Sequence, residues 1–119
     1  MKKILVVEDN EQNLYLMQYM LETSGYAVVV VTNGAEAIVS AAQEKPDLIL
    51  MDIQLPDIDG LEATRRIRAS EANAKIPIVA VTSFAMTGDR EKALEAGCNG
   101  YIEKPIDPEA FLSSIARYL

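Results

Sequence analysis

Five short apolar runs, each followed by a stretch with apolar residues every three or four positions, dominate the sequence. The runs cover residues 4–7, 26–31, 48–51, 76–81 and 100–102. Continuous apolar runs of this length are typical of strands buried on both faces, and the spacing that follows them is typical of amphipathic helices. Five strand-then-helix units in succession predict a parallel sheet, because parallel neighbours need helical crossovers.

Handedness and strand order narrow this prediction to one architecture. Right-handed crossovers with one reversal of strand order give a flavodoxin-like α/β fold, a (βα)5 three-layer sandwich with a parallel sheet of order 2-1-3-4-5. We expect one domain over residues 1–119, since the length suits a single domain and the chain contains no repeat or linker. In this order the first and third strands are neighbours, roughly 4.8 Å apart.

The expected helix starts fall at residues that favour helix ends. These starts lie at or near Glu11, Asn33, Leu61, Thr87 and Pro108. Asn10 or Asp9 is expected to cap the first helix, and Gly60 precedes the third because glycine permits unusual backbone angles. We interpret the three arginines of the third helix as a solvated face: Arg65, Arg66 and Arg68.

Charge and residue usage exclude several classes of function. The chain has 11 basic and 18 acidic residues, a net charge of −7, which disfavours binding to nucleic acid or to an anionic membrane surface. No apolar run approaches the ~20 residues of a transmembrane helix, and no signal peptide is evident. The lone Cys98 permits no internal disulfide and fits a reducing, cytoplasmic location. Without histidine, the chain has no Ser-His-Asp or Cys-His catalysis and no phosphohistidine of its own.

Polar residues follow four of the expected strands at the point where each strand ends. Glu8 and Asp9 follow the first, Asp52 the third, Thr82 ends the fourth and Lys104 follows the fifth. Each alone has an ordinary structural interpretation, as a helix cap, a strand end or a surface charge. Because the carboxyl ends of parallel strands meet at one edge, where ligands bind in such folds, we expect the five side chains to converge there.

This set of residues suits phosphoryl chemistry with a metal ion. Three neighbouring carboxylates repel one another, and a divalent cation would relieve that repulsion. Ligands that are all oxygen, without histidine or cysteine, favour Mg²⁺ or Mn²⁺ over zinc or copper. A carboxylate such as Asp52, beside the cation and opposite an ammonium group, is set up to attack phosphorus and become an aspartyl phosphate. Lys104 and the Thr82 hydroxyl would then stabilise the phosphoryl oxygens.

Four pieces of the sequence resemble a known family along the whole chain. They are Val-Val-Glu-Asp-Asn at 6–10, Asp52 with Leu-Pro-Asp-Ile-Asp-Gly at 55–60, Thr82-Ser83, and Tyr-Ile-Glu-Lys-Pro at 101–105. In this order and spacing they resemble the receiver domains of bacterial two-component response regulators. Ser-Phe-Ala-Met-Thr-Gly-Asp at 83–89 is similar to the corresponding part of stand-alone, DivK-like regulators and of hybrid-kinase receivers.

The resemblance implies a role for each matching residue. Asp52 matches the phosphoacceptor, and Glu8 and Asp9 match the acidic pair that holds Mg²⁺. The backbone carbonyl of Gln54 matches the remaining protein ligand. Glu8 stands where many members have aspartate, so direct and water-mediated metal binding both remain open for it.

The resemblance also implies a route for the signal and a site of tuning. Thr82 and Lys104 match the switch residues that contact the phosphoryl group, and Tyr101 matches the aromatic residue whose rotamer reports phosphorylation. The Lys104–Pro105 bond matches one that is often cis. The side chains at Gln54 and Phe84 occupy positions that, in the family, tune the loss of the phosphoryl group.

Together these features predict a phosphorylation-dependent switch rather than an enzyme that turns over external substrates. We expect it to take a phosphoryl group from a sensor histidine kinase or histidine phosphotransferase onto Asp52 and to signal to an effector protein. One alternative is a receiver-like module that signals without phosphorylation. Two further alternatives fit less well. A haloacid-dehalogenase-type phosphatase would need a second acid at the position of Gln54, and a flavodoxin would need a Ser/Thr-rich loop at the position of Glu8 and Asp9.

Overall fold

Five parallel strands form one sheet in the computed structural model, which describes residues 1–70, 73–83 and 88–119. The strands are β1 (Lys3–Val7), β2 (Ala27–Val31), β3 (Leu48–Asp52), β4 (Ile78–Thr82) and β5 (Gly100–Glu103). Their spatial order is β2-β1-β3-β4-β5, and each neighbouring pair is parallel. The predicted flavodoxin-like order is therefore confirmed.

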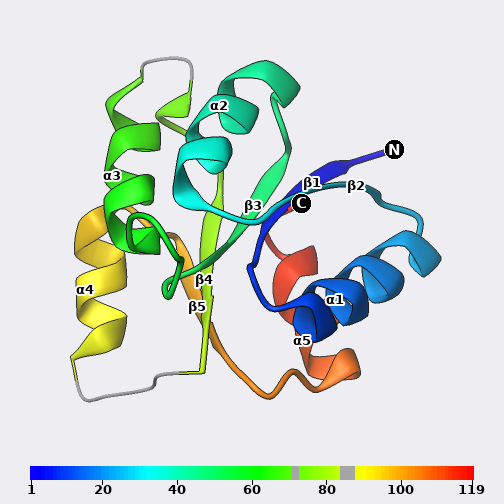
Figure 1. The fold of residues 1–119 in the computed structure, drawn as a ribbon. Coiled ribbons are helices and arrows are strands. Elements are labelled where there is room, and N and C mark those ends of the chain that lie inside the picture. Colours follow the sequence, from blue (N-terminus) through cyan, green and yellow to red (C-terminus); the bar gives the residue numbers. More distant parts are fainter. Residues whose placement is uncertain (71–72, 84–87) are drawn as a thin grey trace.

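Helices cover both faces of this sheet and complete a three-layer sandwich (Figure 1). They are α1 (Glu11–Thr23), α2 (Gly34–Glu44), α3 (Gly60–Ala69), α4 (Asp89–Ala96) and α5 (Pro108–Ala116). Helices α1 and α5 lie on one face, and α2, α3 and α4 lie on the other (Figure 1). None of the helices in the described residues combines the length and apolar character needed to cross a bilayer.

A separate apolar cluster fills each of the two interfaces between sheet and helices. The cluster beneath α1 and α5 contains Met17 and Met20 together with Phe111 and Ile115. In the cluster beneath α2, α3 and α4, the buried helical residues are mostly alanines, so these helices approach the sheet closely. All residues of the central strands β3 and β4 are buried. Burial on both faces explains why these strands appear in the sequence as continuous apolar runs.

Capping residues set the helix starts much as the sequence indicates. Asn10, rather than Asp9, caps α1, because its side-chain oxygen accepts a hydrogen bond from the Asn13 N–H at 3.0 Å. Asn33 caps α2 in the same way through the Glu36 N–H at 2.9 Å. The expected start of the fourth helix at Thr87 lies outside the described residues.

Strand β4 begins two residues later than predicted, and Arg68 contributes to the difference. The Ile76 carbonyl oxygen accepts a hydrogen bond from the Arg68 guanidinium, and Pro77 has no N–H to donate to a neighbouring strand. The apolar run therefore extends beyond the strand, which starts at Ile78.

The interpretation of the three arginines as a solvated face is wrong for Arg68. Arg65 and Arg66 are exposed and pair with Glu62 at 3.3 and 3.0 Å. Arg68, in the last turn of α3, instead donates to the Gly97 carbonyl oxygen at 2.9 Å and to the Asn99 side-chain oxygen at 2.6 Å. It thus ties α3 to the segment that leads from α4 into β5.

Candidate functional site

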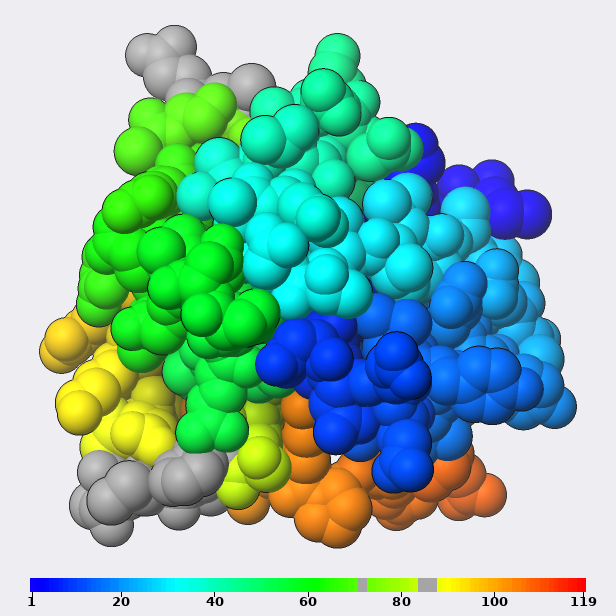
Figure 2. Space-filling model, in the orientation of Figure 1, coloured from blue at the N-terminus to red at the C-terminus, as the bar shows by residue number. Residues whose placement is uncertain are grey.

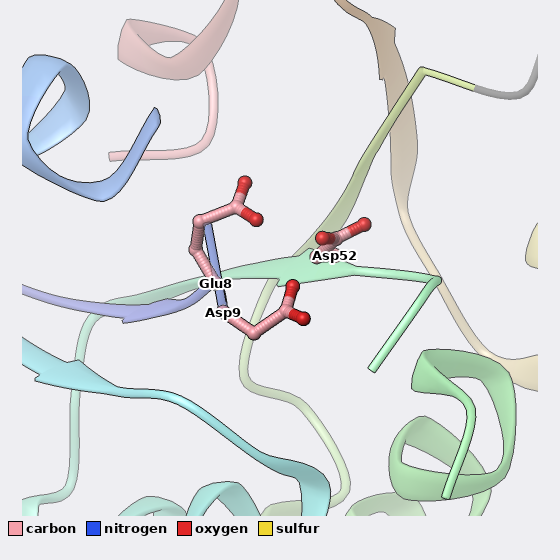
Figure 3. Close-up of side chains that lie close together, drawn as sticks. All are labelled: Glu8, Asp9 and Asp52. Carbon is pink, nitrogen blue, oxygen red and sulfur yellow. The ribbon is translucent and has the colours of Figure 1, made fainter. Parts of the chain in front are cut away.

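Three acidic side chains meet at the carboxyl ends of β1 and β3. Val7 pairs with Met51, so Glu8 and Asp52 occupy the next level of the sheet. Figure 3 shows the carboxyl groups of Glu8, Asp9 and Asp52 near one another, and a ligand oxygen from each lies within 4.8 Å of the others. Glu8 and Asp52 are only 1% and 5% exposed, whereas Asp9 is exposed to solvent. The site therefore has a buried inner part and an open outer edge.

Lys104 brings an ammonium group into contact with both buried carboxylates. Its Nζ donates to Glu8 Oε1 and, at 3.5 Å, to Asp52 Oδ2, and its side chain is 9% exposed. The Lys104 N–H also donates to the Thr82 carbonyl oxygen at 2.9 Å, which holds the end of β5 beside the end of β4. The fifth strand thus delivers a positive charge to an otherwise acidic site.

The environment of Asp52 favours its protonated form. Burial of the carboxyl group, with the hydrogen bond and charge of Glu8, raises the pKa of Asp52 from 3.8 to about 7. The charge of Lys104 and the hydrogen bond from the Gln54 N–H, at 3.1 Å, act in the opposite direction. Near neutral pH Asp52 is therefore poised between its two protonation states, and an added cation would favour the carboxylate.

Gly60 is required at the base of the β3–α3 loop (residues 53–59) by a close approach of the backbone. Its φ angle is not positive, so the expected need for unusual backbone angles is wrong. Instead, a Cβ atom there would lie 2.1 Å from the Asp52 carbonyl oxygen and 2.8 Å from the Ile53 Cα. The Gly60 N–H donates to the Ile53 carbonyl oxygen at 2.7 Å, which closes the loop directly behind Asp52.

Thr82 and Tyr101 lie on the side of the site formed by β4 and β5. Val81 pairs with Asp52, so Thr82, which is fully buried, lies one residue beyond the level of Asp52. Tyr101 pairs with Ala80 and packs partly buried against the cluster beneath α2, α3 and α4. The Lys104–Pro105 bond is cis, as the family resemblance implied. Phe84 lies outside the described residues.

Sequence reasoning missed Asp57, which links the β3–α3 loop to helix α2. Its two carboxylate oxygens accept hydrogen bonds from the N–H groups of Gly34, at 2.8 Å, and Ala35, at 2.9 Å. These bonds lower the pKa of Asp57 from 3.8 to about 2. An acid near the amino end of a helix is a recognised signal, but Asp57 is far from α2 in the sequence and meets it only in the folded chain.

The donor set of the site fits a divalent cation of the Mg²⁺ type. The candidate ligands Glu8, Asp9 and Asp52 supply oxygen alone, and hard cations prefer oxygen. The single ammonium group of Lys104 faces three carboxyl groups, so the acidic groups of the site outnumber its positive charge. The site is thus chemically suited to a cation.

Comparison with known proteins matches nearly the whole chain to one family, the one that the sequence motifs resemble. The family model for the response regulator receiver domain matches residues 4–116. The polar-differentiation response regulator DivK of Brucella anthropi is 46% identical over 118 residues, which cover 99% of this chain and 96% of that protein.

Solved structures of similar fold include receiver domains from two settings. The receiver domain of the sensor histidine kinase PA1611 from Pseudomonas aeruginosa has a magnesium ion in its active site cleft. It matches with a TM-score of 0.91 and 43% identity, covering 98% of this chain and 96% of that chain. The chemotaxis protein CheY4 of Vibrio cholerae matches with a TM-score of 0.95 and 27% identity, covering 100% and 99% of the two chains.

Proposed function

This chain belongs to the response regulator receiver domain family, whose members are signalling proteins rather than substrate-turnover enzymes, and we propose that Asp52 is its phosphoacceptor. The observation that carries the proposal is the placement of Asp52. Its side chain is 7% exposed, and its carboxyl group lies beside two further carboxyl groups and contacts the Lys104 ammonium at 3.5 Å. A phosphoryl group on a carboxylate oxygen of Asp52 would point into the site rather than into the core.

The transfer step would proceed by attack of an Asp52 carboxylate oxygen on the phosphorus of a partner's phosphohistidine. The new O–P bond forms as the P–N bond breaks, and the imidazole nitrogen leaves with the electron pair and takes up a proton. Attack by water on phosphorus would later release inorganic phosphate and restore the Asp52 carboxylate. The first step needs Asp52 as a carboxylate nucleophile, and the second needs the same carboxylate as a leaving group. Groups that compensate its negative charge therefore assist both steps.

The acidic side chains would hold the metal ion. Glu8, Asp9 and Asp52, with the backbone carbonyl of Gln54, are the proposed ligands of Mg²⁺, or of Mn²⁺ in its place. When bound, the ion supplies positive charge to the phosphoryl oxygens. Support comes from the 4.8 Å grouping of the carboxylates and from the magnesium-bound receiver domain of PA1611.

Lys104 and Thr82 would contact the phosphoryl group. Lys104 already contacts Asp52, and its bond to Glu8 would be exchanged for one to a phosphoryl oxygen once a cation balances Glu8. The Thr82 hydroxyl lies one residue beyond the strand position opposite Asp52 and would donate to a second oxygen. Both groups act by position and charge, as in other phosphoryl-transfer sites.

The proposed partners are a sensor histidine kinase or histidine phosphotransferase and a downstream effector protein. A donor outside the chain is required because the chain has no histidine of its own. The phosphatase alternative is disfavoured because Gln54 stands where a second acid is needed. The cytoplasmic location stays a prediction.

The proposal is tested by treating the protein with acetyl phosphate in the presence of Mg²⁺. Intact-mass measurement should show one added phosphoryl group, which hydroxylamine removes and which does not form when EDTA is present. Asp52→Ala should keep the fold and lose the modification, whereas the control Asp107→Ala, at an exposed position without a side-chain capping bond, should keep it. Full modification of Asp52→Ala would contradict the assignment.

A further inference from the structure

The β3–α3 loop is held to helix α2 by Asp57 as well as to its own strand. Both oxygens of the Asp57 carboxylate are used, one by the Gly34 N–H at 2.8 Å and one by the Ala35 N–H at 2.9 Å. Figure 2 shows the green atoms of this loop lying against the cyan atoms at the start of α2. A carboxylate with two backbone donors has one preferred orientation, so the bond restricts the loop as well as capping the helix.

Close packing at the same point leaves the loop little freedom to shift. A Cβ atom on Gly34 would lie 2.4 Å from Ile58 Cγ1, so the residue after Asp57 packs directly on the helix backbone. Ile58 in turn packs against the cluster beneath α2, α3 and α4. The tip of the loop is thus fixed by two hydrogen bonds on one side and by apolar contact on the other.

The start of α2 is itself fixed relative to the acidic pair. The Glu8 N–H donates to the Val31 carbonyl oxygen at 3.1 Å, and Val31 precedes Gly34 by three residues. A chain of contacts therefore runs from Glu8 through the β2–α2 turn to Asp57 and the loop. At the other end of the loop, the Gln54 N–H donates to Asp52 at 3.1 Å. Asp57 thus connects the segment that follows Glu8's partner strand to the loop that follows Asp52.

Capping of α2 alone does not account for Asp57. Asn33 already caps this helix through the Glu36 N–H at 2.9 Å. Asp57 lies on a different segment and binds the N–H groups that Asn33 leaves. What Asp57 adds is the link between the helix and the loop.

From these contacts we propose that Asp57 is a positioning residue for the metal site: it fixes the loop that carries the Gln54 carbonyl relative to Glu8 and Asp9. The inference rests on the proposed function, because it concerns the same cation. Residues that orient metal ligands without touching the metal typically change its affinity about 10- to 100-fold when they are removed. Because Asp57 acts through a loop, we expect an effect at the low end, roughly tenfold.

The test compares Asp57→Ala with Asn33→Ala, which removes a cap from the same helix without touching the loop. Calorimetric titration with MgCl2 should give a roughly tenfold higher dissociation constant for Asp57→Ala and less than a twofold change for Asn33→Ala. Asp57→Asn, which keeps one acceptor oxygen, should fall between wild type and Asp57→Ala. Both alanine variants should lower the melting temperature without Mg²⁺, so stability alone does not separate the two roles.

A kinetic measurement separates positioning from a general loss of activity. The rate of phosphorylation by acetyl phosphate should be reduced in Asp57→Ala at low Mg²⁺ and return to within about twofold of wild type at saturating Mg²⁺. Equal Mg²⁺ dissociation constants for Asp57→Ala and Asn33→Ala would overturn the inference and leave the proposed function intact. Failure of the wild-type protein to bind Mg²⁺ would overturn the proposed metal site, and this inference with it.

Discussion

At the scale of single residues, neighbouring charges at the site have opposite effects on the pKa of Asp52. Its pKa is raised to about 7, mainly by burial and then by Glu8, although Lys104 lies within 3.5 Å. The folded protein therefore binds a proton at Asp52 more tightly than the unfolded chain does. Stability contributed by this proton is present at acid pH and is lost as the pH rises through about 7.

Asp52→Asn should therefore change the pH dependence of stability in the absence of divalent cations. The variant removes a charge that the folded state disfavours and keeps an oxygen to accept the Gln54 N–H bond. At pH 8 it should be more stable than wild type by roughly 1–4 kcal/mol, and the difference should vanish below about pH 4. Urea denaturation at a series of pH values with EDTA measures this. If the free energy of unfolding changed with pH in the same way for both proteins, the charged form of Asp52 would not destabilise the folded state.

Asp9, the exposed member of the acidic group, should contribute to cation binding more than to folding. Millimolar Mg²⁺ should raise the melting temperature of the wild-type protein, since binding to the folded state alone stabilises it. Asp9→Asn should reduce this rise, yet leave the protein without Mg²⁺ no less stable because one repelling charge is gone. Glu22→Gln, at an exposed position near the end of α1, is the control and should behave as wild type. An unchanged Mg²⁺ effect in Asp9→Asn would argue against a role for Asp9.

Among the elements, helix α3 packs on the sheet through buried residues such as Ala63 and Ile67, and an arginine in its last turn adds hydrogen bonds to neighbouring segments. Arg68 donates to the carbonyl oxygens of Asn73 and Gly97 at 3.2 and 2.9 Å, and to the Asn99 side chain at 2.6 Å. Burial lowers the pKa of its guanidinium group. Its partners are neutral oxygens, so the contribution of Arg68 to stability depends on hydrogen-bond geometry more than on charge.

Arg68→Ala should therefore destabilise the protein far more than Arg65→Ala. Loss of Arg68 leaves several carbonyl groups without their donor, which should lower the free energy of unfolding by roughly 1–3 kcal/mol. Arg65 makes an exposed ion pair with Glu62, and its loss should cost less than about 1 kcal/mol. Arg68→Lys should not restore stability, because an ammonium group lacks the planar set of donors. Chemical denaturation measures all three, and equal effects for Arg65 and Arg68 would contradict the account.

The elements could be predicted from the sequence because each depends on a local pattern, and the strand order followed from the handedness of crossovers in parallel sheets. Buried runs mark the strands, and Asn10 and Asn33 mark helix starts within a few residues of their partners. The placement of Asp57 on α2 and of Arg68 on the segment after α4 depends on contacts between parts distant in sequence. No local pattern encodes those contacts. The reason for Gly60 was missed likewise, because it concerns the approach of the loop to the end of β3.

In the molecule as a whole, we expect the site to communicate with a surface through β4, β5 and α4. Tyr101 packs partly buried, and burial, then Asp89 at the start of α4, then Glu103 raise the pKa of its phenol group. Inward movement of Thr82 and Lys104 toward a phosphoryl group would act on the same two strands. We therefore expect Tyr101 to turn further inward on phosphorylation and to alter the face formed by α4, β5 and α5.

Comparison of the protein with and without beryllofluoride and Mg²⁺ by NMR tests this route. The expected result is a change in the Tyr101 ring signals and in amide signals along α4 and β5. In Thr82→Ala the signals around Asp52 should still respond, while those of Tyr101 should respond much less. Changes confined to the loops around Asp52 in the wild-type protein would contradict a route through Tyr101.

The central claim, that Asp52 accepts the phosphoryl group, is tested most directly by mapping the modified residue. Borohydride reduces an aspartyl phosphate to homoserine, so peptide mass spectrometry after treatment with acetyl phosphate, Mg²⁺ and then borohydride identifies the acceptor. We predict homoserine at position 52, in an amount that falls when Mg²⁺ is withheld. Homoserine at Asp9 or Asp57 in place of Asp52, or none at all after full phosphorylation, would contradict the account.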